Sequence, residues 1–442
     1  MDGIQKGDVI RKEEYLVVQK VDGEQSRVLR LVPKQKVLIE KLKFNADSVI
    51  GQRFGLFEVI NGDCRPLHAD RLREQDEPMI DDSLSTESKD DEKLTPIAPS
   101  ALKLEPEQKR QKMEHDEVLE LKKLGATANE LVAKLVQGSA SFSTRTTYSQ
   151  SKYIGRKSKK HSDRVLILRP TIRLLAKSYY LKDADRLAML RNDQLGLILQ
   201  MAGIHFGKKV VVFEQTLGLI TSAVIERLAG RGGCVHIHRG AIAQSIPCVH
   251  SMNYTEEKMS TFLPVRIKCL LAGKQLPYDN HRKPNDDDDA ECADDDKKND
   301  DIENSEEDRK DDVEPKEDSG DVEQSATRRA RRMENERKGL EIIENGAQSL
   351  IIASRTIDPI DVLEHIYSKL APSATIVIYS PHMNILVDSY EWLVNHDAIN
   401  INITDQMCRI MQVLPDRTHP LMAQHVVGGN VLSAIKTDVA VK

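Results

Sequence analysis

Residues 209–238 constrain the fold of this chain more than any other segment. The run 209–214 (KVVVFE) is apolar and ends in an acid, residues 219–229 have helical periodicity, and a glycine stop at Gly230 precedes a second apolar run at 234–238 (CVHIH). A strand, a helix and a strand in so short a segment form a crossover unit, whose strands are parallel and whose sheet is covered on both faces. The segment therefore predicts an α/β domain.

The same alternation of elements continues along the second half of the chain. Short apolar runs predict strands at 165–170, 349–353, 374–379, 399–403 and 426–435. Helical periodicity predicts helices at 171–181, 193–202, 327–345, 359–370 and 383–396. We therefore predict a doubly wound α/β domain over residues 165–442.

An acidic segment interrupts this domain at about 274–326 and has no apolar periodicity. Within it, residues 285–318 hold 19 Asp or Glu and 5 Lys or Arg. The net charge is −6 for the whole chain and −14 for this segment, which leaves +8 on the remainder. The composition predicts a disordered insert. The basic remainder favours a polyanionic partner.

The N-terminal part predicts a separate small domain. Five runs rich in Val and Leu, separated by turn signals such as Asn61-Gly62, predict a small β-barrel over residues 1–72. The polar and acidic composition of 73–106 predicts a disordered linker. Residues 107–164 predict a connector that is helical at first and basic at its end.

Several classes of function are excluded by motifs that the sequence lacks. The six cysteines form no C-x-x-C pair, which argues against a disulfide framework or a zinc knuckle and favours reduced thiols in the cytosol or nucleus. No apolar run approaches the ~20 residues of a membrane span, and the N-terminus is too polar for a secretory signal. No nucleophile elbow, Walker loop or H-E-x-x-H motif occurs, so we predict no catalytic residue.

The turn after residues 209–214 resembles a cofactor turn but lacks two of its features. A G-x-G-x-G frame would let the backbone approach a ligand, and an acid at the end of the next strand would bind ribose hydroxyls. Here the frame reads Thr216-Leu217-Gly218-Leu219-Ile220, and the next strand ends His236-Ile237-His238-Arg239 without a carboxylate. The turn is either a working pocket or a structural unit without cofactor, and the sequence favours the second.

Two other strand ends carry side chains that suggest chemistry. His236 and His238 share one strand face, but without a Cys or carboxylate at ligand spacing they indicate strand-face histidines rather than a metal pair, so we predict no metal. The predicted strand at 349–353 is followed by Ser354 and Arg355, where many α/β enzymes hold a catalytic acid or amide. A cation there suits a phosphate better than proton chemistry.

A basic segment at 151–164 is the strongest sign of a binding partner. Lysines, arginines and a histidine are concentrated within it beside Tyr153, at Lys152, Arg156, Lys157, Lys159, Lys160, His161 and Arg164. Such density binds phosphates through counterion release, and the tyrosine can stack on a base or ribose. A nuclear-localisation patch and a solvated surface remain the alternatives. The arginines at 328–332 are a weaker signal, and residues 409–420 combine cations with prolines that suit either a phosphate loop or a structural turn.

Four motifs together resemble one family, the non-catalytic, RNA-binding subunits of the eukaryotic tRNA adenine-N1-methyltransferase that modifies the T-loop adenosine. They are FSTRTTYSQSKYIGRKSKK at 142–160, VVVFEQTLGLITSAVIERLAG at 210–230, SLIIASR at 349–355, and QVLPDRTHP at 412–420 with Gly428-Gly429. The resemblance covers most of the chain except 73–100 and 274–326. It implies a class I methyltransferase fold, Rossmann-like and with a degenerate cofactor site, behind the N-terminal β-barrel.

The resemblance also implies how the chain acts and which residues bind tRNA. The chain would bind no cofactor itself and would pair with a catalytic paralogue that binds S-adenosylmethionine, as a two-plus-two heterotetramer in the nucleus. The tRNA contacts would fall on Lys109, Arg110, Lys152, Tyr153, Arg156, Lys157, Lys159, Lys160, His161, Lys182, Arg186, Arg332, Arg355, Arg409, Thr418, His419, Pro420 and Met422. Residues 101–111 depart from the family's usual Asn/Asp-rich stretch. The remaining alternatives are a general RNA-binding protein in translation and an active methyltransferase with an atypical pocket.

Overall fold

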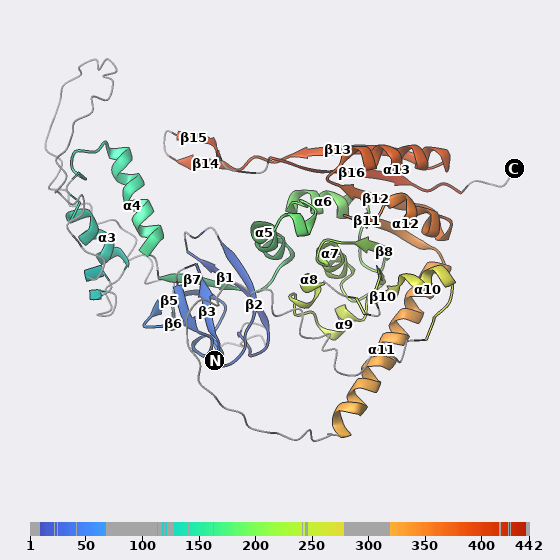
Figure 1. Ribbon diagram of the computed structural model, residues 1–442, viewed down its shortest axis with the longest axis horizontal. Coiled ribbons are helices and arrows are strands. Elements are labelled where there is room, and N and C mark those ends of the chain that lie inside the picture. Colours follow the sequence, from blue (N-terminus) through green and yellow to red (C-terminus); the bar gives the residue numbers. More distant parts are fainter. Residues whose placement is uncertain are drawn as a thin grey trace, which may run out of the picture. The chain divides into compact units, whose positions relative to one another are not determined.

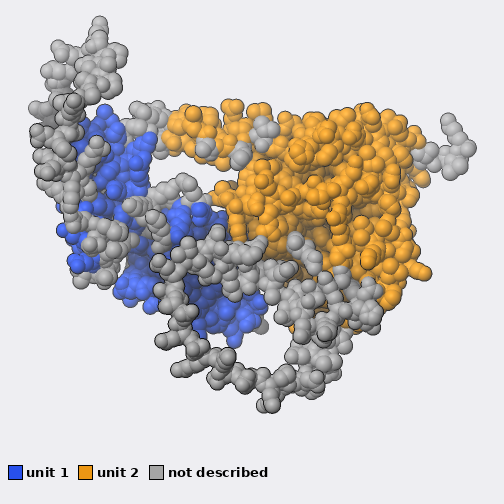
Figure 2. Space-filling model, in the orientation of Figure 1, with its two compact units in different colours: residues 1–169 blue, residues 170–442 orange. Residues whose placement is uncertain are grey.

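The computed structural model describes residues 9–67, 113–277 and 319–438, apart from positions 22, 24, 41, 114–116, 119, 122–127, 140, 162, 241, 244–245, 415–416, 423 and 425 (Figure 1). The chain divides into two compact units, residues 1–169 and 170–442 (Figure 2). The predicted linker at 73–106 and the acidic residues 285–318 lie outside the described residues. Each unit has its own hydrophobic core.

The N-terminal unit is built on a five-stranded antiparallel sheet. Its order is β2-β1-β7-β5-β6, with bounds β1 (Tyr15–Lys20), β2 (Ser26–Arg30), β5 (Gly55–Ile60), β6 (Asp63–Pro66) and β7 (Arg164–Leu168). A separate hairpin is formed by β3 (Lys36–Ile39) and β4 (Leu42–Asn45), followed by the short helix η1 (Ala46–Ser48). Alternate residues of the strands face a common core that includes Val18, Phe57 and Ile167.

The predicted barrel at 1–72 is not confirmed, because the strand order is linear and ends at β2 and β6. The described residues thus form an open sheet and a hairpin, and no closed barrel is seen among them. The central strand β7 comes from residues 164–168 and pairs with both β1 and β5. The prediction that this strand belongs to the second domain, residues 165–442, is therefore wrong. Its side chains Val165 and Ile167 are fully buried in the N-terminal core instead.

Two helices occupy the segment that was predicted as a connector. They are α3 (Ala128–Gln137) and α4 (Thr147–His161), and they pack against each other. Leu131 and Leu135, one turn apart on α3, are buried in a small cluster with Val118. The basic stretch therefore forms helix α4. Its neighbour α3 is held in place by the burial of Leu131 and Leu135 in this cluster.

The C-terminal unit contains a seven-stranded sheet in the order β10-β9-β8-β11-β12-β16-β13. The strands are β8 (Lys209–Glu214), β9 (Gly233–His238), β10 (Phe262–Arg266), β11 (Ala347–Ala353), β12 (Leu370–Ser380), β13 (Ile399–Met407) and β16 (Val427–Ile435). The pairs from β10 to β12 are parallel, whereas β16 is antiparallel to both of its neighbours. A further hairpin is formed by β14 (Met411–Leu414) and β15 (Arg417–Pro420).

Helices cover both faces of this sheet, as a parallel sheet requires. One group contacts β8, β12 and β16 and comprises α5 (Ile172–Lys182), α6 (Asn192–Met201) and α7 (Leu219–Leu228), with the short helix η3 (Asp185–Leu187) beside α5. The other comprises α11 (Ser319–Glu344), α12 (Pro359–Ile366) and α13 (Met383–Asn395). The remaining short helices are α8 (Pro247–His250), α9 (Glu256–Met259), α10 (Ile267–Ala272) and η5 (Tyr367–Lys369).

The predicted α/β architecture of the second half is confirmed. The structure adds two features that are not among the predicted elements, strand β10 and the β14–β15 hairpin. It also begins α11 at Ser319, inside the segment predicted as a disordered insert. Among the described helices, none has both the length and the apolar character needed to cross a membrane.

Candidate cofactor crevice and nucleic-acid interface

The strand order of the large sheet reverses between β8 and β11. In doubly wound sheets, ligands bind in the crevice at the carboxyl ends of the strands on either side of this reversal. Here that place is framed by the end of β8 at Glu214, the following turn, and the loop after β11 at Ser354. A cofactor site in this fold is therefore expected at this crevice.

The carboxylate of Glu214 is bound by the turn and helix that follow it. Its Oε2 accepts hydrogen bonds from the hydroxyl of Thr216 and from the backbone N–H of Ile220 (3.2 Å), and Oε1 accepts from the N–H of Thr221 (2.5 Å). Burial raises the pKa of Glu214, against the opposing effect of the hydrogen bonds from Thr216 and Thr221. The acid thus caps the start of α7, where unpaired N–H groups attract a negative charge.

The one glycine of the turn is closed to a ligand by a neighbouring side chain. Gly218 has a φ of +72°, which favours glycine, and the preceding Leu217 also has a positive φ of 58°. A Cβ atom on Gly218 would lie 2.9 Å from the Cβ of Ile246. The buried Ile246 therefore packs against the open side of the glycine, where a cofactor would need to approach the backbone.

Gln215 bridges the crevice from the turn after β8 to the loop after β11. Its Oε1 accepts hydrogen bonds from the backbone N–H groups of Arg355 (2.7 Å) and Thr356 (3.0 Å), and its Nε2 donates to the hydroxyl of Thr356 (2.9 Å). The backbone N–H of Gln215 also donates to the carbonyl of Ala353 (2.9 Å). These contacts use backbone donors that could otherwise bind an anion at the strand ends.

The second strand of the unit ends in buried histidines. The hydroxyl of Thr221 lies 2.9 Å from Nδ1 of His236, and the His236 ring stacks toward that of His238 with centroids 6.4 Å apart. Burial lowers the pKa of each histidine to about 4, so both are neutral at pH 7. Within the described residues, no three His, Cys, Asp or Glu side chains come together as metal ligands do. Both histidines are therefore buried side chains of the core.

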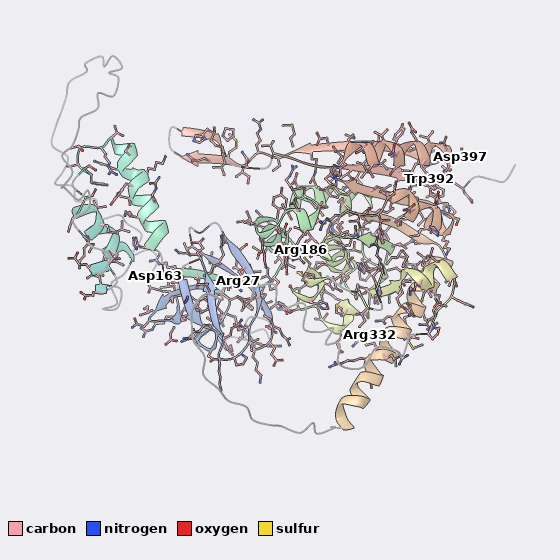
Figure 3. All side chains as sticks on the ribbon, in the orientation of Figure 1. Arg27, Asp163, Arg186, Arg332, Trp392 and Asp397 are labelled. Carbon is pink, nitrogen blue, oxygen red and sulfur yellow. The ribbon has the colours of Figure 1, made fainter. Side chains whose placement is uncertain are left out.

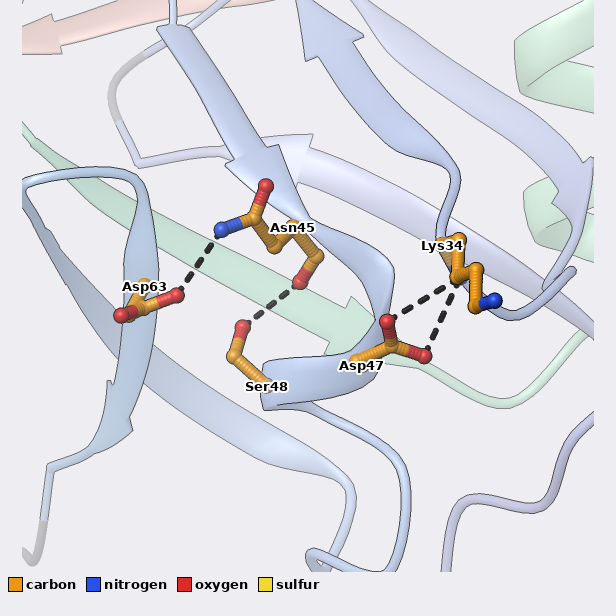
Figure 4. Close-up of a pocket in the computed structure, with 5 residues that line it drawn as sticks. All are labelled: Lys34, Asn45, Asp47, Ser48 and Asp63. Carbon is orange, nitrogen blue, oxygen red and sulfur yellow. Dashed lines mark hydrogen bonds between the residues drawn. The ribbon is translucent and has the colours of Figure 1, made fainter.

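A surface pocket is present elsewhere, in the N-terminal unit (Figure 4). It is lined by Lys34, Asn45, Asp47, Ser48 and Asp63. Asn45 donates to Asp63 (3.0 Å), the Ser48 hydroxyl donates to the Asn45 carbonyl (2.6 Å), and the Lys34 backbone N–H donates to both oxygens of Asp47 (3.2 and 3.0 Å). The lining groups thus hydrogen-bond one another, and these bonds hold together the turns that form the pocket.

Helix α4 carries cations predicted to bind RNA. Lys152 and Arg156 are both exposed and lie four residues apart, so they share one face of the helix. Lys157 is half-buried, and His161, the last residue of α4, is buried. The helix thus presents a cationic face at Lys152 and Arg156, suited to a phosphate backbone.

Tyr153 of α4 already has partners on its ring. The guanidinium of Arg145 lies 4.9 Å from the ring centroid, and the Lys157 ammonium lies 5.4 Å from it. Phe142 packs against the same ring at 5.7 Å between centroids. Cation–π contacts of this kind fix the direction of cations. The structure therefore favours a role for Tyr153 in orienting Arg145 and Lys157, and its stacking on a base stays a prediction.

The C-terminal predicted contacts lie together on one arm, which we define as residues 408–426 between β13 and β16. The arm contains the β14–β15 hairpin, which extends from the body of the unit (Figure 1). Met422 is 94% exposed. Also on the arm are the exposed Arg409, Thr418 and His419 and the half-buried Pro420.

The other predicted contacts are dispersed. Arg355 is exposed on the loop that Gln215 binds, Lys182 is exposed at the end of α5, and Arg186 is half-buried in η3. Arg332 is half-buried on α11, at the other end of this unit from the arm (Figure 3). Four contacts lie outside the described residues, Lys109 and Arg110 entirely and Lys159 and Lys160 in their side chains.

The residue that anchors the arm is absent from the contacts predicted from the sequence. Arg191 is buried, and its guanidinium donates to the carbonyl of Gln406, in β13 just before the arm, and to that of Val426, the last residue of the arm (both 2.8 Å). It also donates to Asp193 (2.8 and 2.9 Å), and these bonds hold the pKa of Asp193 below its ordinary value. No periodicity or motif connects positions so far apart in the chain, so only the structure reveals this anchor.

The sheet order, with its reversal between β8 and β11 and helices on both faces, defines a doubly wound α/β protein. The whole chain is similar in fold to a SAM-dependent O-methyltransferase from Thermotoga maritima, with a TM-score of 0.50, 8% sequence identity, and coverage of 99% of this chain and 98% of that one. At this identity the likeness concerns the fold alone. It agrees with the predicted class I methyltransferase architecture of the second half.

The chain belongs to the Gcd10p family, whose model matches residues 9–336. It is similar to the tRNA (adenine(58)-N(1))-methyltransferase non-catalytic subunit of Dictyostelium discoideum, with 27% identity over 97% of this chain and 80% of that one. It is also 27% identical to the subunit of the same name from Mus musculus, over 96% of this chain and 88% of that one. The resemblance predicted from the sequence is confirmed, and these relatives are named as non-catalytic, as predicted for this chain.

Proposed function

We propose that this chain is the non-catalytic, tRNA-binding subunit of a tRNA adenine-N1-methyltransferase, and that a catalytic paralogue supplies S-adenosylmethionine and the reaction at the T-loop adenosine. The contacts at the crevice support the proposal: Ile246 packs against Gly218 of the turn, and Gln215 accepts hydrogen bonds from the backbone N–H groups after β11. The names of the relatives support the same assignment. The chain's own role is to bind and orient tRNA.

Two elements that the structure describes are proposed to bind tRNA, the cationic face of α4 in the first unit and the arm in the second. Exposed cations on a rigid helix bind phosphates without sequence preference and position an RNA for a partner's active site. The arm provides Arg409 and the exposed side chains of β15. We also propose a two-plus-two assembly with the catalytic subunit in the nucleus, which light scattering of the purified complex and imaging of a tagged chain would test.

The decisive experiment reconstitutes the reaction from purified subunits. Methylation of tRNA is measured with this chain alone, with the catalytic subunit alone and with both, and calorimetry measures binding of S-adenosylmethionine to this chain. We expect no methylation and no heat of binding with this chain alone, and full activity with both subunits. Micromolar cofactor binding by the isolated chain would overturn the assignment, because the crevice would then be open.

A second experiment tests the tRNA surface. Lys152→Glu with Arg156→Glu should weaken tRNA binding and lower the slope of log Kd against log salt by about 1 for each phosphate that these side chains no longer neutralise. Lys209→Glu with Lys268→Glu is a matched control, since both lysines are exposed and the charge change is equal. If both variants weakened binding equally, only net charge would matter, and α4 would not have its proposed role.

A further inference from the structure

Helix α13 has an apolar stripe that faces solvent. Its inner side chains Leu386, Ser389 and Leu393 are fully buried against the unit's core. Four other side chains of the same helix are exposed although they are apolar or aromatic: Met383 (45%), Val387 (43%), Tyr390 (38%) and Val394 (49%). The described part of the chain provides no cover for them. One helix thus carries two apolar surfaces, only one of which has a partner.

The four exposed side chains form a single narrow row. Their spacing of four, three and four residues is that of a helix-packing seam, and at ~100° per residue it keeps them within about 60° of one another. Trp392 lies on the opposite side of the helix, where its ring contacts Tyr367 with centroids 5.3 Å apart. Because Tyr367 follows α12, the row points away from α12. It faces the end of the sheet where β13 lies.

Strand β13 extends this surface. It is the last strand in the sheet order, and it pairs with β16 along one edge only within the described residues. Ile399 at its start is 54% exposed and Met407 at its end is 64% exposed. An exposed edge strand beside an apolar helix row is the kind of surface that another chain covers. We call the row on α13 together with β13 the α13–β13 surface.

The charges of the α13–β13 surface point to the kind of chain that covers it. Between Met383 and Met407 the sequence contains four carboxylates, Asp388, Glu391, Asp397 and Asp405, and no lysine or arginine. All four carboxylates are exposed (Asp397 is labelled beside α13 in Figure 3). On α13 the two carboxylates lie on one side of the apolar row, Glu391 next to it and Asp388 farther round the helix toward Trp392. A second copy of this chain placed on the same surface would bring like charges together, which opposes such pairing.

We propose that the α13–β13 surface binds the catalytic methyltransferase subunit, through an apolar helix face of that subunit flanked by lysine or arginine. This inference rests on the proposed function, which supplies the need for a catalytic partner. The surface lies at the free edge of the sheet, so a partner bound there leaves the crevice of this chain unused. It also has the apolar centre and charged rim typical of protein interfaces.

The test uses the full-length chain and the purified catalytic subunit. Val387→Glu with Val394→Glu places carboxylates in the apolar row, and we expect the Kd for the catalytic subunit to rise at least about tenfold, because a charge buried in an apolar contact loses its hydration. Asp388→Lys with Glu391→Lys should also weaken binding, by reversing the rim. Leu271→Glu is the control, because Leu271 is 56% exposed on α10 away from this surface.

Separate measurements distinguish a failure of the proposed function from a failure of this inference alone. The tRNA affinity of each isolated variant should equal that of the wild-type chain, which also shows that the variant is folded. If the wild-type chain fails to bind the catalytic subunit, the proposed function fails and this inference with it. If the wild-type chain binds and the α13 variants bind equally well, this inference alone is overturned. A wild-type homodimer that the α13 variants dissociate would overturn the choice of partner.

Discussion

Replacing Arg266 by methionine tests the contact that joins β10 to α11 in the C-terminal unit. The guanidinium of Arg266 donates two parallel hydrogen bonds of 2.8 Å to the carboxylate of Glu336, and the backbone N–H of Arg266 donates a third (3.2 Å). Both residues are buried, Glu336 with 1% of its surface exposed. The same guanidinium also donates to the carbonyl of Leu276 (2.5 Å).

The expected cost of the substitution follows from the charge that remains. Methionine preserves most of the side-chain volume but leaves the Glu336 carboxylate buried without its cation, and removing one partner of such a pair costs about 3–5 kcal/mol. Arg266→Met with Glu336→Leu removes both charges and should recover most of that stability, since an apolar replacement of a whole buried pair is often neutral or stabilising. The two substitutions are therefore strongly non-additive.

Urea unfolding measured by tryptophan fluorescence is the suitable assay. Trp392 is the only tryptophan in the chain, and it lies in the C-terminal unit, so its signal reports this unit without interference from the other. Arg337→Met is the control, because Arg337 pairs with Glu334 on the exposed side of the same helix and its replacement should leave the midpoint unchanged. A destabilisation below about 1 kcal/mol for Arg266→Met, or a double variant as unstable as the sum of the single ones, would refute the reasoning.

The pH dependence provides an independent check of the same contact. Burial acts to raise the pKa of Glu336, but the hydrogen bonds from Arg266 outweigh it and hold the pKa below its ordinary value of 4.5. The stability from this carboxylate is thus fully present above pH 4.5 and disappears as the pH falls through the lowered folded value. Without the guanidinium, the largest opposing contact is lost, and burial raises the pKa of Glu336 although the backbone N–H of residue 266 still donates to it. The deficit of Arg266→Met should therefore shrink as the pH falls from 7 toward 5, and a constant deficit would contradict this account.

Three further predictions concern β16 and the crevice. Gly429→Ala should cost about 1–3 kcal/mol in the same urea assay, because the added Cβ would lie 2.6 Å from the hydroxyl of the buried Tyr379. Glu214→Gln should cost about 1–3 kcal/mol, since an amide cannot accept all three hydrogen bonds that the carboxylate does, and an unchanged midpoint would contradict this. Gln215→Ala should speed hydrogen exchange at the amides of Arg355 and Thr356, whereas exchange at wild-type rates would show that this bridge does not hold the loop.

The elements of the crevice could be predicted from the sequence, but the contacts that close it could not. Residues 209–238 predict the strand, the turn and the helix because local periodicity reports which faces are buried. The missing glycines at Thr216 and Ile220 indicate that a ligand would lack open backbone there. The bridge from Gln215 to Thr356 spans 141 positions, and no local pattern contains it.

The N-terminal unit shows the same limit in its topology. The strand at 164–168 is evident from its apolar residues, but a single apolar strand carries no sign of which sheet it enters. The structure places it between β1 and β5, in the centre of the first unit. Register and partners depend on which surface a strand can bury, and this is a property of the whole unit.

The sequence by itself determined the α/β class, the basic segment at 151–164 and the absence of the cofactor turn's glycines, because each depends on residue types at short spacing. The tertiary structure alone decided that Gln215 and Ile246 occupy the crevice and that Arg191 anchors the arm. It also showed the apolar row of α13 at the free edge of the sheet. These features arise when distant segments pack together, and their energy comes from burial and hydrogen bonds that exist only in the folded chain.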